Sequence, residues 1–140
     1  MCYCKLFLHN SLGGIMREQQ KFEDATEWYK KELAIRLKLG DESNIADAYY
    51  WVGVVAEKQQ KFEDATEWYK KELAIRLKLD DELDVAYAYC RLGGIAEKQQ
   101  KHKVAEEWYN KALKISGQIE NQTLSDEIKQ SIARLKKGYR

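Results

Sequence analysis

Apolar residues recur along most of the chain at steps of three and four, the spacing of a helix with one buried face. In the first clear stretch they are Phe22, Ala25, Trp28, Tyr29, Leu33, Ile35 and Leu37. In the next they are Ile45, Ala48, Tyr49, Val52, Val55 and Ala56. The pattern predicts helices over about residues 22–39, 44–58, 62–79, 85–98, 102–116 and 123–138.

Polar positions suggest how these helices begin, end and face water. Glu32 stands four residues before Arg36, a spacing that supports a solvent-exposed helix face by about 0.2–0.5 kcal/mol per pair. Gly40 suits the left-handed position after a helix end, and residues 41–43 are predicted to form the turn that caps the next helix. Residues 117–122 are predicted to be a polar break, followed by a capping box of Thr123 and Asp126.

The pattern repeats. The stretch Gln19–Leu39, QQKFEDATEWYKKELAIRLKL, returns letter for letter at Gln59–Leu79, and a degenerate copy begins at Gln99. A fixed step of forty residues indicates a repeat array, each unit being two antiparallel helices. The first helix of the first unit is expected over about residues 4–18, although only its second half follows the pattern of the other units.

These boundaries define one array over residues 1–140 with seven helices in all. Its predicted parts are repeat 1 at about 4–40, repeat 2 at about 44–80, repeat 3 at about 84–117 and a capping helix at about 123–138. The last helix has a narrow apolar stripe and a polar outer face, as expected where an open stack of repeats is closed.

The motif residues resemble those of tetratricopeptide (TPR) repeats, in which aromatic-x2-Leu-Gly-x2-aromatic is followed by Ala-x3-Phe. The third unit has Tyr89, Leu92, Gly93, Ala96, Ala105 and Tyr109 at these positions. The forty-residue form resembles the repeats of kinesin light chains, of Pins/LGN adaptors and of bacterial Rap-type regulators. The chain departs from the usual pattern in two respects: it has no proline, and Glu32 and Glu72 stand where a small residue is usual.

The resemblance implies an all-α, right-handed α-α superhelix of three TPR helix pairs with a C-terminal capping helix. It implies that the glycine of each first helix lets the second helix pack closely, and that Tyr29, Tyr69 and Tyr109 fill the gap to the next unit. Trp28, Trp68 and Trp108 recur with the same period and are interpreted as packing between repeats.

The first helices of TPR arrays line a concave face, so the resemblance also implies a groove for a protein or peptide segment. The candidate partner-binding residues are Asp47, Tyr50, Trp51, Val54, Tyr87, Arg91 and Lys98. In the first unit the groove positions include Asn10, Ser11, Gly14 and Arg17. These positions vary between units whereas the duplicated stretch does not; a binding surface would give this pattern, and so would recent gene duplication followed by drift.

Within this groove, Tyr50, Trp51 and Tyr87 are expected to form an exposed aromatic cluster beside Arg91, and these residue types are enriched at binding hot spots. The chaperone-binding subclass of the family grips a C-terminal carboxylate at these positions. Of that set only Arg91 is matched cleanly here, so the activity is not supported.

No catalytic motif is present, and no catalytic residue, cofactor or metal is assigned. His9 and His102 occupy aromatic positions of degenerate repeats and are interpreted as packing residues. Cys2, Cys4 and His9 supply three ligands where a structural zinc site needs four, and free thiols are the preferred interpretation. Cys90 is expected to be a small residue of the groove side, at or near the surface.

Composition limits the remaining classes. A net charge of +1 with 34% charged residues gives no general attraction to nucleic acid, and no apolar run is long enough to span a membrane. An odd count of three cysteines favours a cytoplasmic location. The sequence therefore predicts a non-enzymatic scaffold or adaptor. The alternatives are a module that self-assembles as a homo-oligomer through the array ends, and a regulatory fragment of a larger signalling protein.

Overall fold

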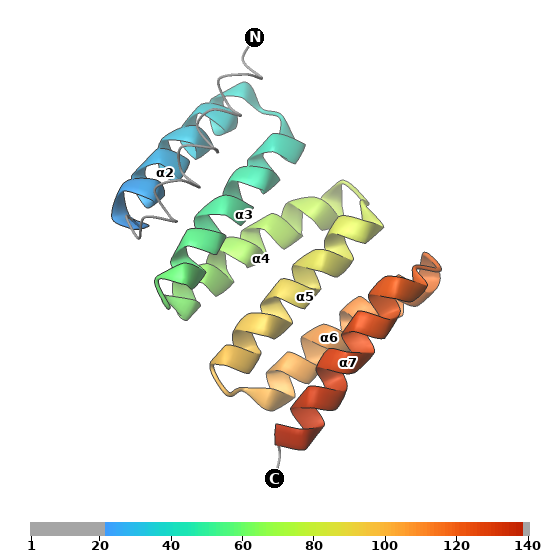
Figure 1. Cartoon of the computed structure of the whole chain (residues 1–140). Coiled ribbons are helices and arrows are strands. Elements are labelled where there is room, and N and C mark those ends of the chain that lie inside the picture. Colours follow the sequence, from blue (N-terminus) through green and yellow to red (C-terminus); the bar gives the residue numbers. More distant parts are fainter. Residues whose placement is uncertain (1–21, 139–140) are drawn as a thin grey trace. The chain divides into compact units, whose positions relative to one another are not determined.

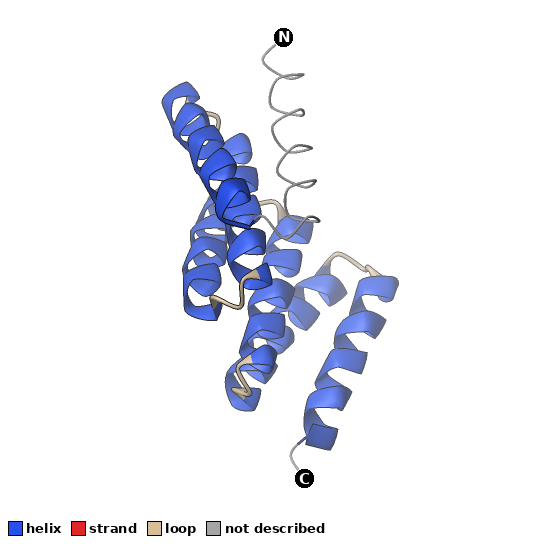
Figure 2. Cartoon of the chain, turned by 60° about the vertical axis from the view of Figure 1, so that its left-hand side comes forward, coloured by secondary structure: helices blue, strands red, loops and turns tan. Residues whose placement is uncertain are grey.

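The computed structural model describes residues 22–138, all of whose regular structure is helical. The helices are α2 (Phe22–Leu39), α3 (Glu42–Lys58), α4 (Phe62–Lys78), α5 (Glu82–Lys98), α6 (His102–Gln118) and α7 (Gln122–Gly138) (Figure 1). Short loops join consecutive helices (Figure 2). The expected all-α fold class is confirmed, and the helix predicted over residues 4–18 lies outside the described residues.

The chain forms two compact units, residues 1–72 and 73–140, and the boundary falls inside α4. Unit 1 contains α2, α3 and most of α4, and unit 2 contains the end of α4 with α5, α6 and α7. Within them α2 packs on α3, α5 packs on α6, and α6 packs on α7.

Each unit has its own apolar core, built from the stripes that the periodicity predicts. In unit 1 the core consists of Ala25, Tyr29, Val52 and Val55, with Phe22, Trp51 and Trp68 packed against it. In unit 2 it consists of Ala86, Ala96, Ala105, Tyr109, Ala112, Leu124, Ile128 and Leu135. The small residues of this set allow close helix contact, and the leucines and isoleucine of α7 cover the surface that α5 and α6 leave open.

The closest helix contacts are between a first-helix glycine and a second-helix tyrosine. A Cβ atom added at Gly53 would lie 2.7 Å from Cε1 of Tyr69, and one added at Gly93 would lie 2.7 Å from Cε1 of Tyr109. Real Cβ atoms do not approach a ring so closely, so only glycine fits. The predicted role of these glycines in close packing is confirmed within each helix pair.

The first helices begin at N-caps spaced forty residues apart. Asp41 Oδ1 accepts from the backbone N–H of Asn44 at 3.3 Å, and Asp81 Oδ1 accepts from that of Asp84 at 3.4 Å. At the third position Asn121 Oδ1 accepts from the N–H of Leu124 at 3.0 Å. The capping box predicted at Thr123 is wrong, because Thr123 lies inside α7 and Asn121 is the cap.

Several helix boundaries differ from the predicted ones. The helices α3 and α5 begin at Glu42 and Glu82, two or three residues earlier than predicted, because a single aspartate caps each of them. Helix α6 continues through Gly117 to Gln118, so the predicted polar break is shorter. Gly40 has φ +76°, which confirms its predicted left-handed conformation.

The Glu32–Arg36 pair is buried rather than solvent-exposed. Glu32 and Arg36 are only 1% and 4% exposed, and Arg36 Nη2 is hydrogen-bonded to Glu32 Oε1. Arg36 Nη1 also donates to the main-chain oxygen of Asn44 in α3 at 2.8 Å. The water-facing side of the helix end carries Ile35 and Leu37 instead, which are 45% and 49% exposed.

Two of the periodic tryptophans, Trp68 and Trp108, stack on tyrosines of their own helix pairs. Trp68 stacks on Tyr49 with ring centroids 5.8 Å apart, and Trp108 stacks on Tyr89 at 5.7 Å. In both cases the two rings belong to the two helices of one pair. The stacking is therefore within a helix pair. Trp68 also packs against the core that Ala25 and Tyr29 of repeat 1 form with Val52 and Val55, so packing between repeats describes only part of its role.

Candidate binding site on the first helices

Four candidate residues lie along one face of α3. Asp47, Tyr50, Trp51 and Val54 follow the spacing i, i+3, i+4 and i+7, which places their side chains in one row on a helix. All four are half-buried. The structure therefore brings these four candidates together on unit 1.

The aromatic residues of this face are tied into the core of unit 1. Trp51 stacks on the buried ring of Tyr29, with centroids 5.8 Å apart and an interplanar angle of 15°. Tyr50 meets Trp51 edge-on at 5.0 Å and lies 6.2 Å from the ring of Tyr69. The expectation that Tyr50 and Trp51 are freely exposed needs correction, since both contribute to packing as well as to the surface.

A second group of candidates lies along α5 in unit 2. Tyr87 is 40% exposed, Arg91 is half-buried and Lys98 is exposed. Between them Cys90 is half-buried, as the sequence predicted. Burial raises the pKa of the Cys90 thiol to about 11, an effect that the nearby Arg91 opposes, so the thiol is kept in its neutral form at neutral pH.

The two groups belong to different units. The structure brings Asp47, Tyr50, Trp51 and Val54 together on α3, and it sets Tyr87, Arg91 and Lys98 along α5. A single surface formed by both groups stays a prediction. The groove positions predicted in repeat 1, which are Asn10, Ser11, Gly14 and Arg17, lie outside the described residues.

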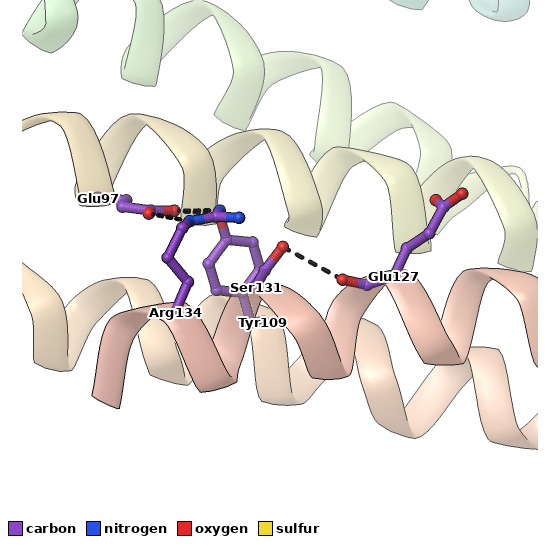
Figure 3. A network of polar contacts seen from close by, with 5 residues as sticks. All are labelled: Glu97, Tyr109, Glu127, Ser131 and Arg134. Carbon is purple, nitrogen blue, oxygen red and sulfur yellow. Dashed lines mark hydrogen bonds and ion pairs between the residues drawn. The ribbon is translucent and has the colours of Figure 1, made fainter. Parts of the chain in front are cut away.

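A polar network that the sequence analysis missed joins the three helices of unit 2 (Figure 3). Arg134 of α7 donates to both carboxylate oxygens of Glu97 in α5, from Nε at 2.7 Å and from Nη2 at 2.9 Å. The hydroxyl of Tyr109 in α6 donates to the same carboxylate at 2.9 Å. The hydrogen bond from Arg134 holds the pKa of Glu97 below its usual value. Burial, together with the hydrogen bond to Glu97, raises the pKa of the Tyr109 hydroxyl.

Part of this network also exists in unit 1. The hydroxyl of Tyr69 donates to Glu57 Oε1 at 3.0 Å, forty residues before the Tyr109–Glu97 contact. A sequence signal was available, because a glutamate stands twelve residues before the motif tyrosine in both units. Arg134 of α7 is not part of the repeat motif, so the sequence gave no such signal for it.

No group of three or more His, Cys, Asp or Glu side chains among residues 22–138 is placed to hold a metal ion. Cys2, Cys4 and His9 lie outside these residues. His102, half-buried, is the first residue of α6. Over the same range, none of the helices combines the length and apolar character that crossing a bilayer requires.

Comparison with known families agrees with the helix-pair geometry. The family model described as tetratricopeptide repeat matches residues 5–76 and, in an overlapping register, residues 44–118. The matches cover most of the chain, and the protein belongs to the tetratricopeptide repeat family. Its fold is the all-α TPR solenoid of consecutive helix pairs.

Solved structures with the same fold include two of the expected kinds, a Rap-type protein and kinesin light chain repeats. BtubC (BKLC) from P. vanneervenii has a TM-score of 0.83 at 18% identity, over 94% of this chain and 54% of that one. The apo form of RapI has a TM-score of 0.76 at 20% identity, over 89% and 45%. The putative kinesin light chain repeats of Podosopora anserina have a TM-score of 0.78 at 14% identity, over 94% and 65%.

Identities this low show the fold and nothing finer. The chain spans about half the length of the first two of these structures and about two thirds of the third. No curated protein matches the sequence.

Proposed function

We propose that this chain is a non-enzymatic scaffold that binds a protein or peptide segment along its first helices. The proposed contact residues are Asp47, Tyr50, Trp51, Val54, Tyr87, Arg91 and Lys98. Membership of the TPR family, whose members serve in general as protein-interaction scaffolds, supports this class of function. Binding a partner does not require a nucleophile, a general base or a metal.

The observation that carries the proposal is the contrast between a fixed frame and variable helix faces. Helices α2 and α4 share the same residues from their first phenylalanine onwards, and their buried positions are nearly the same. On the first helices, Asp47 and Trp51 of α3 correspond to Tyr87 and Arg91 of α5. Residues that differ while the packing around them is retained are free to be selected for a ligand.

Capture from a cell lysate on the immobilised chain, followed by mass spectrometry, tests the proposal. The informative variant is Tyr87→Ala combined with Arg91→Ala, because Tyr87 is among the more exposed candidates and neither residue belongs to the buried core. The matched control is Leu37→Ala, an exposed apolar residue on a second helix. We expect the control to retain the partners of the native chain and the double variant to lose them at least tenfold. Equal capture by all three chains contradicts the proposal.

A second candidate function is self-assembly, which the exposed leucines of the second helices favour. Leu37 and Leu39 of α2 are 49% and 60% exposed, and Leu77 of α4 and Leu79 after it are 50% and 41% exposed. Exposed apolar groups of this kind promote association when they are contiguous. Light scattering over a range of concentrations separates the two candidates, since a scaffold of the first kind keeps a constant mass and a self-assembling module does not.

A further inference from the structure

Charge is divided unevenly between the two units. Residues 1–72 carry thirteen acidic and eleven basic side chains, a net charge of −2. Residues 73–140 carry ten acidic and thirteen basic side chains, a net charge of +3. The net charge of +1 for the whole chain conceals this difference. An acidic unit concentrates cationic ligands near its surface and repels anionic ones.

Within unit 1, the face of α3 places a carboxylate beside aromatic rings. Asp47 stands one helical turn before Trp51 and three residues before Tyr50, so the three side chains are neighbours on the helix surface. The Trp51 ring is held in place by its stack on Tyr29 and by the edge of Tyr50. A fixed indole attracts a cation to its face, and a carboxylate at its side adds a charge-assisted hydrogen bond.

The same protein already holds cations in both of these ways. Lys71 Nζ lies 4.8 Å from the Trp68 ring centroid and 5.8 Å from that of Tyr49, over a stacked tyrosine–tryptophan pair. Lys111 lies at the same two distances from Trp108 and Tyr89. These pairs show that a stacked tyrosine and tryptophan of a helix pair form a surface that accepts a positive charge.

The second way is seen in unit 2, where a guanidinium is bound by a carboxylate and a phenol. Arg134 forms two hydrogen bonds to Glu97, and the Tyr109 hydroxyl shares that carboxylate (Figure 3). A planar guanidinium can both stack on a ring and form paired hydrogen bonds, which a lysine ammonium cannot. The face of α3 offers both kinds of contact at once.

We propose that Asp47, Tyr50 and Trp51 form a site for an arginine side chain of the bound segment, with the guanidinium against the aromatic rings and hydrogen-bonded to the Asp47 carboxylate. This inference rests on the proposed function and names the chemistry of the partner. The corresponding residues of α5 are Tyr87, Cys90 and Arg91, which have no carboxylate and one positive charge. The arginine site is therefore confined to unit 1.

The test uses the full chain and an acetylated, amidated tetra-arginine peptide. Binding is followed through the indole N–H signals in two-dimensional NMR spectra, with Trp51→Phe used to assign the Trp51 signal. We expect the Trp51 indole to shift on titration and the affinity to fall at least tenfold in Asp47→Lys and about threefold in Asp47→Asn. Tetra-citrulline, which has the same shape without the charge, should not bind.

The matched control is Glu63→Lys, which makes the same charge change at an exposed position of α4 in the same unit. It should weaken binding less than twofold. Equal losses in Asp47→Lys and Glu63→Lys would show attraction by net charge alone and would overturn the site. So would the absence of tetra-arginine binding, or a Trp51 shift with tetra-glutamate.

The two proposals can fail separately. If captured proteins depend on Tyr87 and Arg91 but tetra-arginine does not bind, the arginine site is wrong and the scaffold function stands. The Asp47 variants carry the test, because Asp47 lies outside the apolar core of unit 1, whereas Trp51 packs against that core.

Discussion

At the scale of single residues, two adjacent glycines of α5 differ in what a side chain would meet. A Cβ atom at Gly93 would lie 2.7 Å from Cε1 of the buried Tyr109 ring, whereas at Gly94 the nearest atom is the Tyr109 hydroxyl oxygen at 3.8 Å. We expect Gly93→Ala to destabilise the fold by about 1–3 kcal/mol through overpacking. Gly94→Ala should stabilise it by up to about 1 kcal/mol, because alanine favours the helix.

Urea denaturation of the two variants measures both values, and Gly53→Ala should behave like Gly93→Ala because it meets Tyr69 at the same distance. Similar changes at Gly93 and Gly94 would mean that the tyrosine ring moves aside at little cost. The glycine positions were predictable from the sequence, because the motif spacing sets a small residue against a large one. The difference between Gly93 and Gly94 was not predictable, because it depends on where the Tyr109 ring lies in the folded protein.

The buried Glu32–Arg36 pair leads to a second prediction at this scale. Arg36→Met removes the charge that balances Glu32, which is 1% exposed, and leaves the Asn44 carbonyl without its donor. We expect a loss of about 3–5 kcal/mol, as for other buried pairs broken on one side. Adding Glu32→Gln should recover part of that loss, because it removes the uncompensated charge.

A double-mutant cycle in urea gives the two values. Additive effects in the cycle would argue against a coupled pair. The spacing of Glu32 and Arg36 predicted their contact, but helical spacing alone does not tell which side faces water. The useful signal came from comparing repeats. In repeat 3 the positions of Glu32 and Arg36 are taken by the small residues Ala112 and Ser116, both fully buried, which indicates that these positions lie in a packed interface.

At the scale of helices, the existence and order of the elements were predictable because apolar spacing and the forty-residue step agree. The starts were less accurate, because several polar residues before each helix are all plausible caps. The structure selects Asp41, Asp81 and Asn121, which occupy the same position in successive repeats. Comparing repeats, rather than scoring each loop alone, would have found them.

The last of these caps gives a prediction. Asn121 accepts a hydrogen bond from the N–H of Leu124, whereas Thr123 lies within α7 and is exposed. Asn121→Ala should destabilise the fold by about 1 kcal/mol, and Thr123→Ala should have little effect. Thermal melting of the pair decides between them. A larger loss at Thr123 would restore the capping box that the sequence suggested.

At the scale of the whole molecule, the candidate site was predictable in part. The resemblance to TPR repeats placed Asp47, Tyr50, Trp51 and Val54 on one face of a helix, and they lie on one face of α3. The stacking of Trp51 on Tyr29 was not predictable, because it depends on which helix lies beside α3. The Arg134–Glu97 contact was not predictable either, because its residues are thirty-seven positions apart and Arg134 is not part of the repeat motif.

That contact makes the docking of α7 sensitive to pH. Hydrogen bonding from Arg134 lowers the folded-state pKa of Glu97, so its contribution is present above the unfolded pKa and is lost as pH falls through the folded value. Arg134 is more than half exposed, so Arg134→Ala should cost less than about 1 kcal/mol at pH 7. The difference from the native chain should vanish on acidification. A difference that does not shrink as the pH is lowered would assign the effect to packing.

The apolar residues of α7 should matter more than Arg134. Leu124, Ile128 and Leu135 are buried in the core of unit 2, where they cover Tyr109 and Ala112 of α6. A chain ending after Glu120 would expose this surface to water, and burying a leucine or isoleucine contributes about 1.5–3 kcal/mol. We therefore expect the shortened chain to melt at a lower temperature and to associate. Light scattering and thermal melting against the Arg134→Ala chain measure both effects. A shortened chain that remains monomeric and has the same melting temperature as the Arg134→Ala chain would show that α7 does not cover the apolar surface of α6.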